Sequence, residues 1–278
     1  MSFVTTIKEY IPPILLRLLK HLFNYQKTYN SYFDALIASS SLLGYEDPYL
    51  VKTIYEETKE YNLTLNEVFK THIDQTIIHT LLPFSIIQPK DILHILDIGG
   101  ACGIHYFPIK KILGEKYKFK WTIVETNALT NIAKDLENEE LKFCNNINDA
   151  IESLEKIDLI IASGAIQYLD NPKKTLTNLT NLGAEYILLT RLSLTQSSEE
   201  IITVQKSLLS QNSFEKLPNG FSDRIIKYPH TTMKETDFES IIYTNYDVKL
   251  HFDDESGIQK INNKKCIGYG LLLQKKLK

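Results

Sequence analysis

Apolar and polar positions divide the chain into two parts that meet near residue 90. In the first part, apolar residues recur at the spacing of amphipathic helices, and Pro and Gly residues separate the segments. No segment there has the pattern of a strong strand. Helices are expected over residues 11–23, 31–43, 48–61 and 66–82.

After residue 90, short runs of aliphatic and β-branched residues alternate with helical segments. Strands are expected in the first half of residues 92–103 and over 119–124, 141–144, 157–162 and 184–190. Helices are expected over 128–136, near 149–154 and over 172–182. Such alternation predicts parallel strands joined by right-handed crossovers.

The alternation stops after the fifth of these strands. Residues 191–230 contain no clear crossover helix, which makes this segment long for a simple connection. Thr232 and Glu235 have the spacing of a capping box, which predicts a helix from there to residue 243. Residues 246–252 and 266–273 alternate apolar and polar positions on either side of a turn-rich segment, so we expect a terminal antiparallel hairpin.

Composition and charge restrict the class of protein. With 278 residues, of which 43% are hydrophobic and 23% charged, the chain suits one large globular α/β domain with an appendage, or two small domains. The net charge of −3 provides no basic surplus, so no nucleic-acid partner is expected. Charged and polar residues interrupt the apolar segment 11–23, which is too short for a transmembrane segment and predicts an amphipathic helix packed on the protein.

The three cysteines are widely spaced, at Cys102, Cys144 and Cys266. No Cys-x-x-Cys pair or His/Cys cluster has the spacing of metal ligands, so we expect no metal. Reduced thiols in a cytoplasmic protein are the simplest interpretation.

A glycine-rich loop follows the first predicted strand, in residues 92–103. Its acid, Asp97, comes two positions before Gly99, and a plausible helix begins after Gly103. A strand, a glycine loop and a helix in this order are typical of nucleotide-binding crossovers. An acid at this position would repel a pyrophosphate, so Asp97 suits a ligand with a positive end.

Glu125 ends the second predicted strand, 28 positions after Asp97. An acid at the end of this strand can accept hydrogen bonds from both hydroxyls of a ribose. Nicotinamide cofactors present the same ribose, so Glu125 indicates a nucleoside without selecting its class.

The segment Asp-x-Gly-x-x-x-Gly resembles the first motif of the class I S-adenosylmethionine-dependent methyltransferases, with Ala101 at the family's usual middle glycine and Gly100 at its first variable position. The order of five parallel strands, a helix and an antiparallel pair resembles their sheet. The resemblance implies a Rossmann-like seven-stranded α/β sheet, parallel with a terminal antiparallel hairpin, and S-adenosylmethionine as cofactor. The N-terminal helical region or lid would be residues 1–90, and the cofactor-binding domain 91–278 with an insertion at about 191–230.

Residues 163–172 and several shorter segments, among them 31–35, 103–106 and 203–205, resemble a narrower bacterial group of methyltransferases associated with surface-polysaccharide synthesis. This resemblance implies O-methylation of a sugar hydroxyl, with a small-molecule or glycan acceptor. A homodimer is compatible with it.

The family geometry implies the site residues. The cofactor would contact Asp97, Gly99, Gly100, Ala101, Gly103, Glu125, Asn146 and Ser163, with Asn146 facing the adenine amino group. Gln167 and Tyr168 would position the acceptor, Arg191 would pair with a phosphate or carboxylate on it, and His105 or His230 would take its proton. Tyrosines before residue 90 (Tyr25, Tyr29, Tyr32, Tyr45 and Tyr49) would form a lid over a sugar.

Two other classes remain open. A nicotinamide-dependent oxidoreductase shares the strand, loop and helix and the ribose-binding acid, although Asp97 and the antiparallel ending disfavour it. A non-catalytic binding protein that keeps the methyltransferase fold is compatible with Ala101 and with the absence of an obvious general base.

Overall fold

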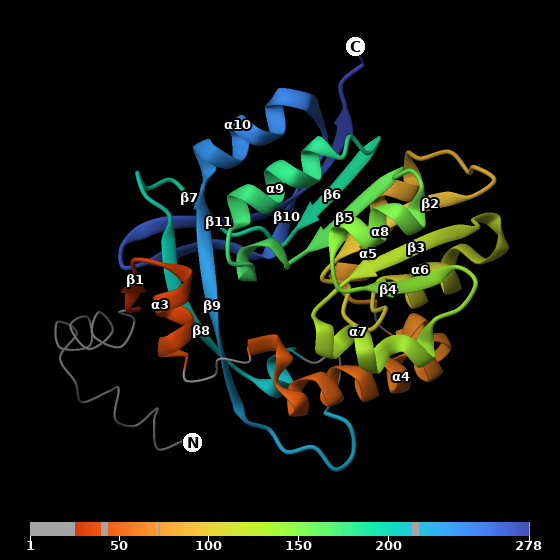
Figure 1. The fold of residues 1–278 in the computed structure, drawn as a ribbon, viewed down its shortest axis with the longest axis horizontal. Helices are drawn as coiled ribbons and strands as arrows, with labels where there is room; N and C mark the ends of the chain where they lie inside the picture. Colours follow the sequence, from red (N-terminus) through yellow and green to blue (C-terminus); the bar gives the residue numbers. More distant parts are fainter. Residues whose placement is uncertain (1–25, 40–43, 72, 213–216, 278) are drawn as a thin grey trace.

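The computed structural model describes residues 26–39, 44–71, 73–212 and 217–277. The helix expected over residues 11–23 and Tyr25 of the expected lid lie outside these ranges. Within them, the dominant feature is one twisted sheet of 11 strands with helices on both faces (Figure 1). This arrangement confirms the α/β fold predicted from the sequence.

Seven neighbouring strands of the sheet are those expected from the sequence. Their order across the sheet is β4 (Leu141–Cys144), β3 (Phe119–Val124), β2 (Leu93–Ile98), β5 (Leu159–Ser163), β6 (Tyr186–Thr190), β11 (Lys264–Lys275) and β10 (Tyr246–Ile261). The first five are parallel, whereas β11 runs antiparallel to β6 and β10 antiparallel to β11. The sheet therefore has the predicted parallel strands and terminal antiparallel hairpin.

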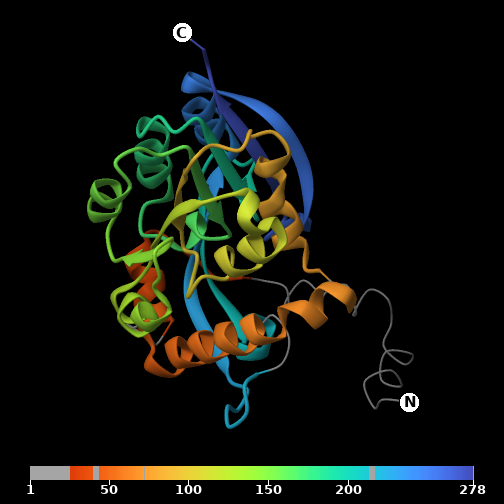
Figure 2. The ribbon, with the colours of Figure 1, turned by 90° about the vertical axis from the view of Figure 1, so that its right-hand side faces the viewer.

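Helices cover the two faces of this sheet in separate layers (Figure 2). The first face carries α4 (Pro48–Thr71), α5 (Gln75–Leu81), α6 (Tyr106–Leu113) and α7 (Asn127–Ala133). The second carries α8 (Ile147–Leu154), α9 (Pro172–Asn181) and α10 (Glu235–Asn245). Strands β2, β5 and β6 are buried on both faces, which explains why their sequences are continuous apolar runs.

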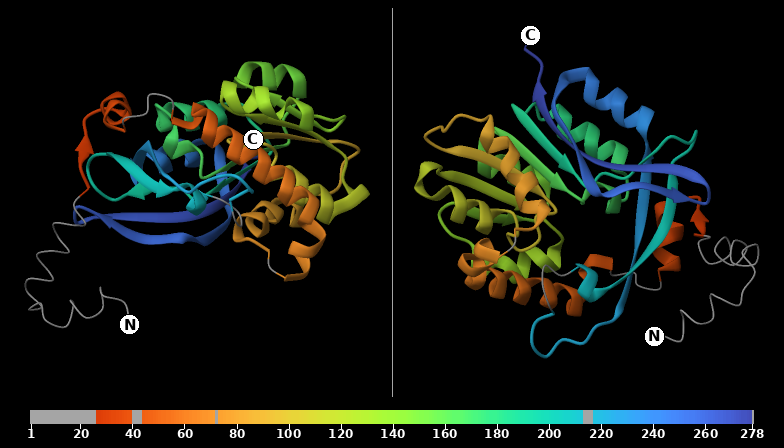
Figure 3. Two further views of the ribbon diagram at one scale, coloured as in Figure 1. Left: turned by 90° about the horizontal axis from the view of Figure 1, so that it is seen from below. Right: turned by 180° about the vertical axis from the view of Figure 1, so that it is seen from behind.

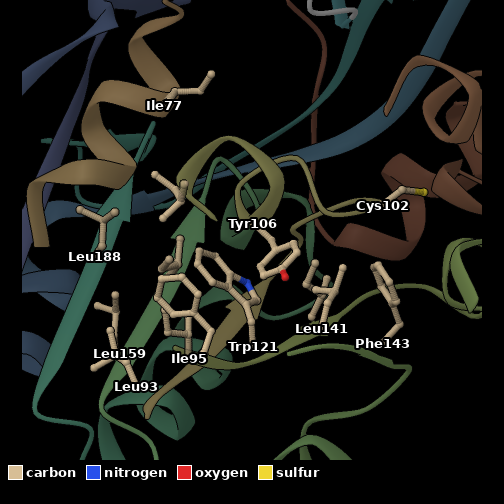
Figure 4. Packing of buried hydrophobic residues seen from close by; sticks show 14 of the residues in the cluster. Ile77, Leu93, Ile95, Cys102, Tyr106, Trp121, Leu141, Phe143, Leu159 and Leu188 are labelled. Carbon is tan, nitrogen blue, oxygen red and sulfur yellow. The ribbon is translucent and has the colours of Figure 1, made fainter. Parts of the chain in front are cut away.

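The core of the first face is aromatic at its centre (Figure 4). The Trp121 ring lies edge-on to Tyr106 and to Phe119, with ring centroids 5.6 Å apart in both pairs. Trp121 is fully buried and belongs to β3, while Tyr106 begins α6. This packing fixes the helix that follows the glycine loop against the sheet.

The insertion predicted at residues 191–230 contains strands. β7 (Leu194–Thr195), β8 (Ile201–Leu208) and β9 (Ile225–Lys234) follow β6, and β8 and β9 pair as a long antiparallel arm (Figure 3). The arm is anchored by β7, which pairs with both β11 and β9. The N-terminal region adds β1 (Thr28–Tyr29) to the free edge of β8, and α3 (Tyr32–Ala38) lies beside the arm.

Several predicted boundaries are wrong. The capping box is wrong because Thr232 lies inside β9, paired with Ile201, and α10 begins after Lys234 without a side-chain cap. The terminal hairpin is longer than predicted, and its turn is the pair Asn262 and Asn263, both at positive φ.

The N-terminal region also differs from its prediction. α4 is one continuous helix where two were expected, because Tyr61 and Leu65 are buried against the core across the predicted break. α5 then starts at a new cap, where the Asp74 carboxylate accepts the Thr76 N–H. Short 3-10 turns complete the chain at Gly44–Glu46, Leu82–Ser85, Gly114–Lys116, Lys134–Leu136, Ile166–Tyr168 and Leu209–Asn212.

None of the helices in the described ranges has the length and apolar character needed to cross a membrane.

Candidate functional site

A cavity of about 1470 Å³ opens at the carboxyl ends of the parallel strands. Its walls come from the loops after β2, β3, β5 and β6, from β8 and β9 of the arm, from the turn end of the hairpin β10 and β11, and from N-terminal residues between 26 and 79. The predicted site residues that line it are Gly99, Ala101, His105, Glu125, Ser163, Gln167, Tyr168, Arg191 and His230. Asp97, Gly100, Gly103 and Asn146 are outside this lining. Single small-molecule sites occupy about 300–1,000 Å³, so the cavity has room for two ligands side by side.

The glycine loop after β2 is packed too closely for larger residues. A methyl group on Gly99, whose φ is +73°, would lie 2.5 Å from Cβ of Ala165 in the loop after β5. A methyl group on Gly100 would lie 2.4 Å from Oδ2 of Asp97. Ala101 has a left-handed backbone with φ of 48°, a conformation that glycine adopts more easily. The loop therefore keeps the geometry of a glycine-rich turn although alanine replaces one glycine.

Asp97 packs against this loop from the core of the protein. Its side chain is fully buried, with Oδ2 3.0 Å from Nδ1 of His105 and 3.2 Å from Nε1 of Trp121, which donates to it. Both protein partners contact the carboxylate inside the core, so a direct contact between Asp97 and the positive end of a ligand stays a prediction.

His105 is locked by the same contact. A carboxylate can only accept hydrogen bonds, so Nδ1 of His105 carries the hydrogen and a neutral imidazole leaves Nε2 as an acceptor. Nε2 is buried and has no hydrogen-bond partner in the described part of the chain. The His105 side chain is 2% exposed, and a general base must reach the proton that it removes. That His105 acts as a general base stays a prediction, and it requires Nε2 to become accessible to the acceptor.

Glu125 connects the end of β3 to the glycine loop. Its Oε1 accepts the Ala101 N–H at 2.9 Å, and its Oε2 accepts the Thr126 N–H at 3.0 Å. Burial and, to a smaller extent, the charges of Asp97 and Glu46 raise the pKa of Glu125 to about 7, against the effect of these two hydrogen bonds. Each carboxylate oxygen keeps a second acceptor position, as a pair of ribose hydroxyls would require.

Glu46 brings the N-terminal region to this point. Its two carboxylate oxygens accept the N–H groups of Asn127 and Ala128, at 2.9 and 3.0 Å, in the first turn of α7. The neighbouring residue, Tyr45, consequently lies close to Glu125 and lines the cavity. The sequence placed Tyr45 in a tyrosine-rich lid but gave no signal for Glu46, because its partners are distant in the chain.

Three tyrosines and a histidine that line the cavity form an aromatic wall. Ring centroids of Tyr228 lie 5.3 Å from Tyr45 and 5.2 Å from Tyr168, and the Tyr168 and His230 rings are 5.4 Å apart. The Tyr168 hydroxyl donates to Gln205 of β8 at 3.1 Å. Tyr228 was missed at the sequence level because its pairing with the loop after β5 depends on the arm.

Burial keeps this wall uncharged near neutral pH. It raises the pKa of Tyr45 and Tyr228 and raises that of Tyr168 to about 12. Burial also lowers the pKa of His230 to about 4, so its imidazole is neutral and able to accept a hydrogen bond.

The loops after β5 and β6 are tied together by three side chains. Thr190 donates to the Ser163 hydroxyl at 2.6 Å, and Nη2 of Arg191 donates to the Ser163 carbonyl at 3.0 Å. Nε2 of Gln167 donates to the Arg191 carbonyl at 2.9 Å. Gln167 is therefore a positioning residue for Arg191 in this structure, and its predicted contact with an acceptor stays a prediction.

Asn146 has a local partner. Its side-chain oxygen accepts the Asp149 N–H at 2.9 Å and caps α8, while its amide donates to the side chains of Asn145 and Asp149. The predicted contact with an adenine amino group stays a prediction. No group of three His, Cys, Asp or Glu side chains in the described ranges is placed to hold a metal ion.

No protein-family model matches the sequence, and no curated protein matches it. Several solved methyltransferase structures are similar to it at low identity. The CcbJ methyltransferase from Streptomyces caelestis has a TM-score of 0.45 and 9% identity, over 76% of this chain and 96% of that one. An S-adenosylmethionine-dependent methyltransferase from Clostridium acetobutylicum has a TM-score of 0.41 and 14% identity, over 78% and 98%. These values are low, so the fold assignment depends on the strand order of this chain and not on its neighbours.

Proposed function

We propose that this protein is a methyltransferase that uses S-adenosylmethionine. The observation that carries the proposal is the contact of Glu125 with the Ala101 amide, which joins a nucleoside-binding acid to a glycine loop. Both border a cavity at the carboxyl ends of β2 and β3, where ligands of open α/β sheets bind. The Rossmann-like order of the sheet and its antiparallel ending support the methyltransferase over the nicotinamide enzyme.

The residues present fit this cofactor. Gly99 lines the cavity without a side chain, and Glu125 has acceptor positions left for ribose hydroxyls. Bound S-adenosylmethionine would supply an electrophilic methyl group for direct displacement. The protein would hold the acceptor in line and exclude water, which suits a site enclosed by the arm and the N-terminal region.

The acceptor that we propose is a sugar hydroxyl of a surface polysaccharide or its activated precursor. The sequence resemblance supports this choice, and so does the aromatic wall, because rings of Tyr45, Tyr168 and Tyr228 suit the face of an uncharged ring. His230 is the better placed of the two candidate bases, since part of its side chain is exposed whereas the His105 side chain is 2% exposed. A cytoplasmic location and a homodimer stay predictions.

Calorimetry tests the cofactor directly. We expect S-adenosylhomocysteine to bind and NAD to bind far more weakly, and Glu125→Ala to weaken S-adenosylhomocysteine by about 1.5–3 kcal/mol through lost charge-assisted hydrogen bonds. Glu152→Ala, which removes an exposed acid from α8, is the matched control. Tight NAD binding would establish the oxidoreductase alternative instead.

Labelled S-adenosylmethionine, incubated with nucleotide-sugar and oligosaccharide pools, tests the reaction. A labelled sugar product would support the proposed acceptor. Cofactor binding without transfer to any pool would favour another acceptor class or a non-catalytic binding protein, and Glu125→Ala serves as the inactive control.

A further inference from the structure

Arg191 follows β6 directly and lines the cavity. Its backbone has a φ of 52°, in the left-handed region that a β-carbon disfavours, so the surrounding contacts must hold it there. Those contacts involve both ends of the residue. Its carbonyl accepts Nε2 of Gln167, and its Nη2 donates to the Ser163 carbonyl at 3.0 Å.

Gly164 provides the space for the guanidinium. A β-carbon on Gly164 would lie 2.9 Å from Nε and 3.0 Å from Cζ of Arg191, so any larger residue would displace the group. The turn after β5 and the strained backbone after β6 thus cooperate to hold one cation in a fixed orientation. Such preorganisation reduces the entropy lost when the group binds a ligand.

No carboxylate of the described residues forms an ion pair with Arg191. Arg224, the other arginine in the described ranges, differs in this respect because it pairs with Asp47 and lies over the Tyr49 ring. A guanidinium has five N–H donors, and Arg191 uses one of them on a neutral carbonyl. The remaining donors suit a planar anion, to which arginine binds through two parallel hydrogen bonds.

We propose that Arg191 is an anion-binding residue of the cavity and that it holds a carboxylate or phosphate of the ligand that occupies the site. This inference rests on the proposed function and deepens it. Two ligands would supply the anion: the carboxylate at the amino-acid end of S-adenosylmethionine, or an acidic group on the acceptor, such as the phosphate of an activated sugar.

Binding measurements distinguish the two sources. S-adenosylhomocysteine has the carboxylate, and 5′-methylthioadenosine has the same nucleoside without it. If Arg191 holds the cofactor, Arg191→Met weakens S-adenosylhomocysteine by about 10- to 150-fold and leaves 5′-methylthioadenosine unchanged. If it holds the acceptor, both affinities stay the same, and inorganic pyrophosphate binds the S-adenosylhomocysteine-loaded wild type but not Arg191→Met.

The controls separate charge, shape and folding. Lys111→Met removes an exposed charge from α6 away from the cavity and should match the wild type. Arg191→Lys should recover only part of the affinity, because an ammonium lacks the planar fork. Near-UV circular dichroism verifies that each variant is folded.

Equal binding of S-adenosylhomocysteine, 5′-methylthioadenosine and pyrophosphate by Arg191→Met and wild type would overturn the inference. Wild-type protein that binds neither nucleoside would overturn the proposed cofactor instead. In that case, pyrophosphate binding to the unloaded protein still tests Arg191, since its loss in Arg191→Met supports an anion site and its persistence does not.

Discussion

Replacing Glu125 by Gln should stabilise the ligand-free protein, and the gain should grow with pH. Burial raises the pKa of Glu125 from 4.5 to about 7 in the folded state. An acid whose folded pKa is raised favours folding below its unfolded pKa, and this contribution is lost as pH rises from 4.5 to 7. At about 1.4 kcal/mol per pKa unit, ionising Glu125 costs the folded state at most about 3 kcal/mol above pH 7.

Gln cannot ionise, so it removes this cost, but it also weakens one hydrogen bond of Glu125. Its carbonyl can accept one of the two amide hydrogens, from Ala101 or Thr126, while its NH2 group faces the other, which costs about 1 kcal/mol. The net gain should be about 1–2 kcal/mol at pH 8 and should turn into a loss of about 1 kcal/mol near pH 4.

Urea unfolding at several pH values measures this effect. The difference between Glu125→Gln and wild type should change sign between pH 4 and pH 8, whereas Glu152→Gln on the exposed face of α8 should show no such trend. A difference that is the same at every pH would mean that Glu125 is ionised in the folded protein as easily as in the unfolded chain. The explanation of its charge state would then be wrong.

Two further substitutions test how the glycine loop is supported. Gly100→Ala places a methyl group 2.4 Å from Oδ2 of Asp97 and should lower the free energy of unfolding by about 1–3 kcal/mol in urea titration. Unchanged stability would show that the loop can shift to accommodate the methyl group at little cost. His105→Leu leaves Trp121 as the one donor to the buried Asp97 carboxylate among the described residues, so the free energy of unfolding should fall by about 1–3 kcal/mol at pH 7. A stability equal to wild type would show that the His105–Asp97 pair does not support the loop.

The sheet was predictable because its strands carry their own signal. β2, β5 and β6 are buried on both faces, so each had to be a continuous apolar run, and the alternation with helices fixed their direction. Glu125 and the glycine loop were found for a related reason. Each lies at the carboxyl end of a predicted strand, and the carboxyl ends of neighbouring parallel strands meet at the same edge of a sheet.

The contacts made by Asp97 were not predictable in this way. Whether its carboxylate faces a ligand or the core depends on the turn between Gly99 and Gly103. This turn returns the chain so that Nδ1 of His105 contacts the carboxylate. The arm was missed because β8 becomes progressively exposed along its length, so its apolar periodicity is weak. Tyr228 joined the site only through the pairing of β8 with β9.

The two halves of the cavity have different origins, and this separates their functions. The glycine loop and Glu125 belong to the sheet, whereas Tyr228 and His230 belong to the arm inserted after β6. Tyr168 lies where the halves meet, since it follows β5 and contacts both arm residues. Glu46 attaches the N-terminal region to the first turn of α7, and Arg191 attaches the loop after β6 to the end of β5. Under the proposed function, the sheet would hold the nucleoside, and the added segments would select the acceptor that lies against it.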